Sequence, residues 1–265
     1  MIQYNNHNQI KEIHYNNHSI KYVYGCGGNL VWQTEPVTSK VRLLNKTNMQ
    51  WGYAPCNSSY TLTSDDMYTA WTDTKSDGSM NNNLIEAVVG DCVTVLDDNI
   101  FNYDYSLSAV TIPNTVTAIG NQAFFQTSNL KSITLPSNLV SIGINAFKLS
   151  GLQMSLILPY KLETIGSSAF NDCKLKNITI PNSVTKIGET AFYQNIGSVE
   201  SNTIQFVICR PTVPPTLGRS AFSDSKNTAN YPIYVPDESY EEYCLATNWK
   251  NYADAGRLKP LSQKP

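Results

Sequence analysis

The stretch AVTIPNTVTAIGNQAF, residues 109–124, decides the fold because it returns three more times along the chain. The other copies are SITLPSNLVSIGINAF (132–147), SLILPYKLETIGSSAF (155–170) and NITIPNSVTKIGETAF (177–192). The proline and the final phenylalanine of each copy recur at intervals of 23, 23 and 22 residues. Self-similarity at a short fixed period is the signature of a stacked repeat array.

Weaker copies flank these four. Residues 85–101, IEAVVGDCVTVLDDNIF, fit the pattern with Gly90 at the proline position and Asp97 at the glycine position. Residues 208–222, ICRPTVPPTLGRSAF, keep Gly218 and the Ala-Phe pair in phase after an altered lead-in. Degenerate ends are expected of an array, because its terminal repeats must cover an exposed core.

The residues before each proline predict a short strand. Apolar residues alternate there at period two and are expected to point inward, and the proline ends the strand because it cannot donate to the ladder. The outward positions of these strands hold neutral side chains, which we take as a candidate recognition surface. They are Ala109, Thr111, Ser132, Thr134, Ser155, Ile157, Asn177 and Thr179.

The second half of each repeat predicts close stacking. The glycine of each Ile-Gly pair is expected to take a turn conformation with positive φ. Small Ala beside large Phe lets coils approach, with the phenylalanines forming an internal column. Cys173 aligns with Thr127, Ser150 and Asn195 in the other copies. We therefore interpret it as a structural ladder residue and not as a reactive thiol.

The array closely resembles the BspA-like leucine-rich repeat family, whose units read roughly L-x-x-I-T-I-P-x-S-V-T-x-I-G-x-x-A-F. The resemblance covers residues 85–222 and implies a mainly β leucine-rich-repeat solenoid of about six coils that binds through its surface, without catalysis. The tail at 231–261 looks like the strand-plus-helix cap that follows such arrays. Pro236 and Asp237 supply the helix start, and Tyr240, Tyr243 and Leu245 are the expected buried side.

The N-terminus carries a second duplication, IQYNNH (2–7) and IHYNNH (13–18). Asn-Asn turns with alternating flanks predict a β-meander with strands at 2–4, 10–15, 20–24 and 30–32. SIKYVYGCGGNLVWQTEP (19–36) resembles a short module of virion proteins from tailed phages of gut bacteria, which implies an anchoring or assembly role. The candidate anchoring residues are Tyr4, Tyr15, Tyr22, Tyr24 and Trp32.

The chain thus divides into four parts. Residues 1–36 are the anchoring meander, 37–84 an N-terminal cap, 85–222 the repeats and 223–265 the C-terminal cap. Within 37–84, the segments 41–45 and 49–56 predict paired strands, and residues 64–66 predict the start of a short helix over Met67 and Trp71. Because isolated hairpins are marginal in water, the meander is expected to contact other chains, as in a dimer or trimer.

Composition excludes several classes of protein. The net charge is −2 with 15% charged residues and no basic cluster, which argues against nucleic-acid binding. No run approaches 18 apolar residues, so no membrane-spanning helix is expected, and the start at Met1 lacks the pattern of a signal peptide. The six cysteines are scattered without a C-x-x-C pair, which favours free thiols over a disulfide framework.

The chain also lacks the residue patterns of an active site. Its three histidines, at positions 7, 14 and 18, are expected at turns or on the surface, so no metal site is predicted. The acidic pairs Asp97-Asp98 and Glu241-Glu242 should point apart instead of converging as a glycosidase pair. Gly25-Cys26-Gly27-Gly28 lacks the Lys-Ser/Thr of a phosphate loop, and we interpret it as a structural turn. We predict no catalysis and no cofactor.

Tyrosines extend the candidate recognition surface. Tyr103, Tyr105, Tyr160 and Tyr193 lie outside the inward repeat positions and could line a binding face, although exposed tyrosines are also ordinary surface residues.

Two functional hypotheses remain. The first is a phage virion protein of the head or tail fibre or decoration type, assembled in the host cytoplasm. Its N-terminus would bind other virion proteins and its solenoid a host surface glycan or protein. The alternative is a BspA-type adhesin on a bacterial cell surface, which the repeats alone support.

Overall fold

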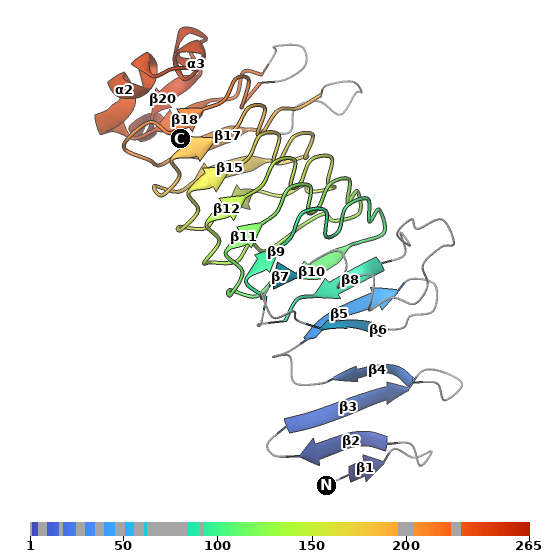
Figure 1. The fold of residues 1–265 in the computed structure, drawn as a ribbon. Coiled ribbons are helices and arrows are strands. Elements are labelled where there is room, and N and C mark those ends of the chain that lie inside the picture. The colour runs from blue at the N-terminus through green and yellow to red at the C-terminus, as the bar shows by residue number, and fades with distance from the viewer. Residues whose placement is uncertain are drawn as a thin grey trace.

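The computed structural model describes the backbone of seven strands between residues 2 and 62, and all atoms of residues 84–90, 93–195, 204–223 and 229–265. Figure 1 shows a chain that begins with an antiparallel sheet, continues as a stack of coils and ends in short helices. The predicted Asn-Asn turns, the turn at 25–28 and the short helix over Met67 and Trp71 lie outside the described residues.

The first sheet is the predicted meander. Strands β1 (Ile2–Tyr4), β2 (Ile10–Tyr15), β3 (His18–Tyr24) and β4 (Leu30–Thr34) pair antiparallel in chain order. His14 lies on β2 and His18 on β3, where it pairs with Tyr15 across the hairpin. The two histidines are therefore on different strands, as the strand interpretation required.

A second sheet joins the cap to the first coil. Strands β5 (Lys40–Asn45) and β6 (Trp51–Pro55) form the predicted hairpin, and β5 also pairs antiparallel with β8 (Leu84–Val88). Strand β8 then pairs parallel with β10 (Ala109–Thr111). The hairpin thus supplies backbone partners to the otherwise open edge of the first coil, which is what an N-terminal cap must do.

A ladder that we call the pre-glycine sheet contains one two-residue strand per coil, placed directly before the glycine position. Its order is β18-β16-β14-β12-β11-β9-β7. The strands are β7 (Thr61–Leu62), β9 (Val95–Leu96), β11 (Ala118–Ile119), β12 (Ser141–Ile142), β14 (Thr164–Ile165), β16 (Lys186–Ile187) and β18 (Thr216–Leu217). The solenoid therefore has about seven turns, one more than the repeat pattern predicted, because β7 comes from the cap segment.

The strands before the prolines form a second ladder, the pre-proline sheet. Strands β13 (Leu156–Ile157), β15 (Asn177–Ile180), β17 (Phe206–Cys209), β19 (Ile233–Val235) and β20 (Leu258–Pro260) follow one another in this sheet, all parallel. The predicted inward positions are buried or half-buried in every copy. Residues 132–135 have this burial pattern but form no strand.

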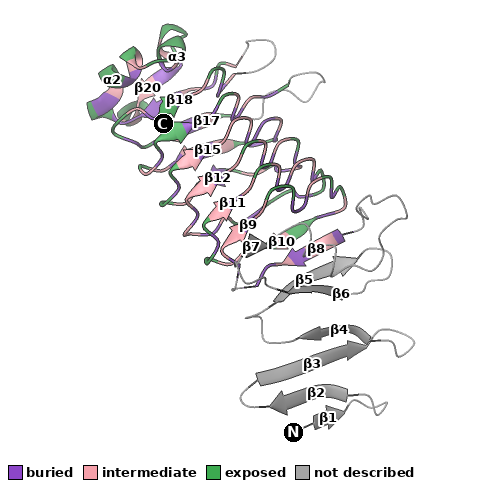
Figure 2. Ribbon diagram, viewed as in Figure 1, coloured by how far each residue is buried: buried purple, intermediate pink, exposed green. Residues whose placement is uncertain are grey.

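The phenylalanines form the predicted internal column. Phe101, Phe124, Phe147, Phe170, Phe192 and Phe222 are all buried, and successive ring centroids lie 4.9–5.4 Å apart. Offset stacked rings at this spacing contribute beyond the apolar area they bury. Figure 2 shows that buried residues recur in coil after coil, so the core runs along the stack and is not one compact centre.

The repeat glycines act differently from the prediction. None of Gly120, Gly143, Gly166 and Gly188 has positive φ; Gly256 is the one described glycine that does. A Cβ on Gly166 would lie 2.4 Å from the backbone carbon of Gly143, and the others are equally crowded. Glycine is needed because adjacent coils touch backbone to backbone at this position.

Positive φ falls two residues later in each coil. The residues there are Asn99, Gln122, Asn145, Ser168, Thr190 and Ser220, with φ between 51° and 62°. The positive φ at these positions could not be predicted from the sequence, because none of them holds a glycine.

The C-terminal cap follows the predicted plan. After β19 come a 3₁₀ turn (Asp237–Ser239), α2 (Tyr240–Leu245), α3 (Lys250–Asp254), β20 and a last 3₁₀ turn (Leu261–Gln263). Tyr243 is buried and Tyr240 packs against the core, as expected. Leu245 is 80% exposed, so its predicted inward position is wrong: α2 is only six residues long and ends there.

Candidate binding surfaces

The outer face of the pre-proline strands holds the first candidate surface. Ala109, Thr111, Ser132, Thr134, Ser155 and Ile157 are exposed, and Asn177 and Thr179 are half-buried. Ile157 is the outlier, since 74% of this large apolar residue is exposed. Strand register aligns Ile157 with Thr179, Ile208 and Tyr234 on successive strands.

The outer face of the pre-proline strands carries aromatic side chains toward its C-terminal end. Phe206 and Tyr234 pack edge to face with ring centroids 6.3 Å apart, and the Lys264 amine lies 4.6 Å from the Phe206 ring. The sequence interpretation missed Phe206 and Ile208 because the lead-in of the last repeat departs from the common pattern. The available signal was the apolar run FVIC at 206–209, which has strand length.

The four predicted tyrosines do not form one site. Tyr103 and Tyr105 neighbour each other in the turn after Phe101, with ring centroids 6.1 Å apart, and the Tyr105 hydroxyl donates to Gln126 Oε1 at 3.0 Å. Tyr160, 66% exposed, instead follows the proline that ends β13, and Tyr193 is half-buried. Only Tyr160 adjoins the pre-proline face.

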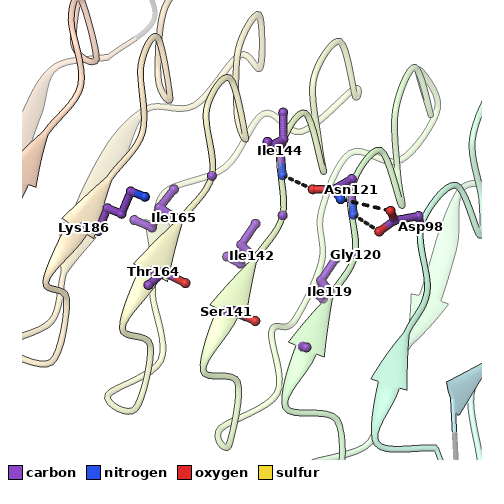
Figure 3. Close-up of a pocket in the computed structure, with 13 residues that line it drawn as sticks. Asp98, Ile119, Gly120, Asn121, Ser141, Ile142, Ile144, Thr164, Ile165 and Lys186 are labelled. Atoms are coloured by element: carbon purple, nitrogen blue, oxygen red, sulfur yellow. Dashed lines mark hydrogen bonds between the residues drawn. The ribbon is translucent and has the colours of Figure 1, made fainter.

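The second candidate surface is a trough of about 380 Å³ across the pre-glycine sheet, which sequence reasoning missed. Along its floor lie the outward residues of four successive strands, Ala118, Ser141, Thr164 and Lys186. Figure 3 shows the Ser141 and Thr164 hydroxyls on neighbouring strands and the Lys186 side chain at one end. Small side chains at this position in three consecutive repeats, Ala118, Ser141 and Thr164, were the signal in the sequence.

Hydrogen bonds between adjacent coils hold the side chains in place at the Asp98 end of the trough. The Asp98 carboxylate accepts from Asn121 N at 2.6 Å and from Asn121 Nδ2 at 3.0 Å. Asn121 Oδ1 in turn accepts from Ile144 N at 2.7 Å, as Figure 3 shows. Side chains here replace the backbone ladder between coils, and they hold the Asp98 carboxylate in a fixed position.

Buried polar groups form a separate column beneath the surface. Asp104, Thr127, Ser150 and Cys173 occupy the same position in successive coils, and all are buried. Cys173 Sγ donates to Phe147 O at 3.0 Å and contacts Ser150 Oγ at 3.3 Å. Burial raises the pKa of Cys173 to about 12, so this thiol stays neutral and unreactive, as a ladder residue should.

Two further cysteines lie in the described part of the chain. Cys209 and Cys244 are also free thiols, and burial raises the pKa of Cys209 to about 12. Among the described residues, no three His, Cys, Asp or Glu side chains gather as a metal site. Nor does any helix in that part of the chain have the length and apolar character to span a membrane. The candidate anchoring residues lie on β1–β4, whose side chains are not described.

A family model matches the repeats of this chain. Residues 79–199 match the BspA type leucine rich repeat region, in six copies. A solved structure similar to this chain is the T. pallidum leucine rich repeat protein, with 23% identity and a TM-score of 0.43 over 56% of this chain and 78% of that chain.

Two further solved structures are similar. A leucine-rich repeat protein from Bacteroides ovatus has 21% identity and a TM-score of 0.41, over 77% of this chain and 59% of that one. The pneumococcal vaccine antigen PcpA has 20% identity and a TM-score of 0.41, over 66% and 40%. A search of curated proteins gives no match. The repeat spacing and the stacked coils agree with this match of residues 79–199 to six copies of the BspA type leucine rich repeat region.

Proposed function

We propose that the chain is a non-enzymatic adhesin of the BspA-like type, displayed on a cell surface, which binds proteins through its solenoid. The observation that carries this proposal is the exposed pair Ile157 and Tyr160 beside neutral hydroxyls on the pre-proline face. Large apolar side chains left in water on a polar surface commonly mark interaction sites, and tyrosine is enriched among residues that contribute most to binding.

The surroundings of this pair fit protein recognition. Thr179, the ladder partner of Ile157, and Thr134, at the same position of the preceding repeat, carry small neutral side chains that a partner can approach without removing water from a charge. The pair sits on coils fixed by the stacked core, so little conformational freedom is lost on binding.

The experiment uses beads coated with the full chain and monolayers of cultured cells. Replacing Ile157 and Tyr160 together by Ser should reduce bead adhesion at least ten-fold. The matched control is Val213→Ser, since Val213 is also 74% exposed but lies in the loop after β17. Protease treatment of the cells should abolish adhesion. If adhesion survives the double replacement, the proposed face is not the binding site. If adhesion is lost after periodate oxidation of the cells but not after protease treatment, the partner is a glycan.

We also propose a second candidate, a virion component anchored through residues 1–36, because residues 19–36 resemble a phage virion module. In that setting the solenoid would contact a host surface and the meander other virion proteins. Mass spectrometry of purified phage particles should then find the chain at structural abundance. Its absence from particles, together with labelling of the chain on intact bacteria, would leave the adhesin alone.

A further inference from the structure

We propose that the trough on the pre-glycine sheet is a separate binding site for an extended polypeptide segment lying across the strands. The segment would place a basic side chain at the Asp98 end and an acidic side chain at the Lys186 end. This site is on a different sheet from Ile157 and Tyr160, so it does not depend on the adhesive face proposed above.

The small residues of the floor are not required by the fold. The same outward position holds Lys186 on β16, so the coils also stack with a much larger side chain there. The glycines beside the floor are different, because they are needed for coil contact. Small side chains at Ala118 and Ser141 therefore keep the trough open without serving the stack.

The groups available to a ligand are side chains, not backbone. Gly120 N, Gly143 N and Gly166 N each donate to a carbonyl of the preceding coil at 2.8 Å, so the backbone ladder is already satisfied. The Ser141 and Thr164 hydroxyls face the trough and can both donate and accept. Peptide amides, which also offer one donor and one acceptor per residue, pair well with such hydroxyls.

The lining residues favour a peptide over a sugar. They include no aromatic ring on which a sugar could stack, whereas Ile144, 51% exposed at the rim, offers an aliphatic contact.

Length and charge define the occupant further. Asp98 and Lys186 are four coils apart, and the ring spacings of 5.1, 4.9, 5.1 and 5.3 Å place those coils about 20 Å from one another. At roughly 3.3 Å per extended residue, the basic and acidic residues of the ligand should be about six positions apart. Opposite charges at the two ends set the direction in which the segment binds.

The experiment measures fluorescence anisotropy of a labelled nonapeptide library against the full chain. Every peptide has Arg at position 2 and Glu at position 8, with random residues between them. Saturable binding below about 1 mM is expected, as for a weak peptide site. Ser141→Tyr, which fills the trough, should weaken binding at least ten-fold. Thr216→Tyr, at the same outward position but outside the trough, should stay within two-fold of the unmodified chain.

Charge exchange tests the orientation. Lys186→Glu should weaken the Arg/Glu peptides, and peptides with Arg at both positions should regain affinity for that variant. The variant lacking Ile157 and Tyr160 should bind the peptides normally, which separates this site from the adhesive face. The proposal fails if the unmodified chain shows no saturable binding, if Ser141→Tyr binds normally, or if Thr216→Tyr loses binding equally.

Discussion

Asp104 is the one acid in a buried column otherwise occupied by Thr127, Ser150 and Cys173. Burial raises its pKa from 3.8 to about 7. Between about pH 3.8 and pH 7, the Asp104 carboxyl group therefore stays protonated in the folded chain but is ionised in the unfolded chain. The stability that this proton contributes is complete below about pH 3.8, falls as the pH rises to about 7, and is absent above that value.

We predict that Asp104→Thr stabilises the protein at pH 8 but much less at pH 4, because a neutral hydroxyl replaces a buried carboxylate. A difference on the order of 4 kcal/mol between the two pH values follows from about 1.4 kcal/mol per pKa unit. Urea unfolding of both proteins across this range measures it. A stability difference that does not change with pH would contradict the prediction.

Gly166 shows how tightly adjacent coils are packed. We predict that Gly166→Ala destabilises the solenoid by about 1–3 kcal/mol, the usual cost of overpacking, because the new Cβ meets the Gly143 backbone. Gly256→Ala is the contrasting variant: its φ is +67° and nothing lies within 4 Å of a new Cβ, so only backbone strain of about 1 kcal/mol is expected. Denaturant midpoints that rank the two variants in reverse would contradict the stacking explanation.

At the scale of the element, the C-terminal cap closes the phenylalanine column. Trp249 is fully buried, lies 5.9 Å from the Phe222 ring and donates its indole N–H to Pro215 O at 2.8 Å. We predict that Trp249→Ala costs about 3–5 kcal/mol and exposes the last coil. Limited proteolysis followed by mass spectrometry should show early cleavage after residue 204.

Trp249→Phe provides the matched comparison, since it keeps a ring but removes the donor. It should cost about 1–2 kcal/mol, because the Pro215 carbonyl loses its partner. Equal losses for the Phe and Ala variants would mean that the hydrogen bond, not the packing, holds the cap.

Strands were predictable wherever the repeat was regular. The apolar alternation before each proline located β10, β13 and β15 in advance. Strand β17 was not predicted, because the prolines around it are out of phase with the repeat. Its register with β15 is nevertheless continuous. The two-residue strands of the pre-glycine sheet are too short for periodicity to identify, and they form because stacked coils align their backbones.

At the scale of the whole molecule, the meander and the solenoid are held by different sheets. Strands β1–β4 pair among themselves, whereas the solenoid edge is paired by β5. We predict that deleting residues 1–36 leaves a solenoid with unchanged circular dichroism and melting temperature but abolishes incorporation into any larger assembly. Multi-angle light scattering should show a dimer or trimer for the full chain and a monomer after deletion. Unchanged assembly by the shortened chain would refute the anchoring role.

The sequence by itself determined the repeat, its register, the inward residues and the phenylalanine column, because a 22- to 23-residue period leaves only one way to superimpose successive coils. The sequence also located the repeat glycines correctly, but the reason predicted for them, a positive φ, was wrong. Tertiary structure alone decided that coils meet backbone to backbone at those glycines, that the cap supplies an extra coil and that the outward residues of four strands, three of them small, line one trough. These features depend on the distance between coils, and no local pattern along the chain encodes that distance.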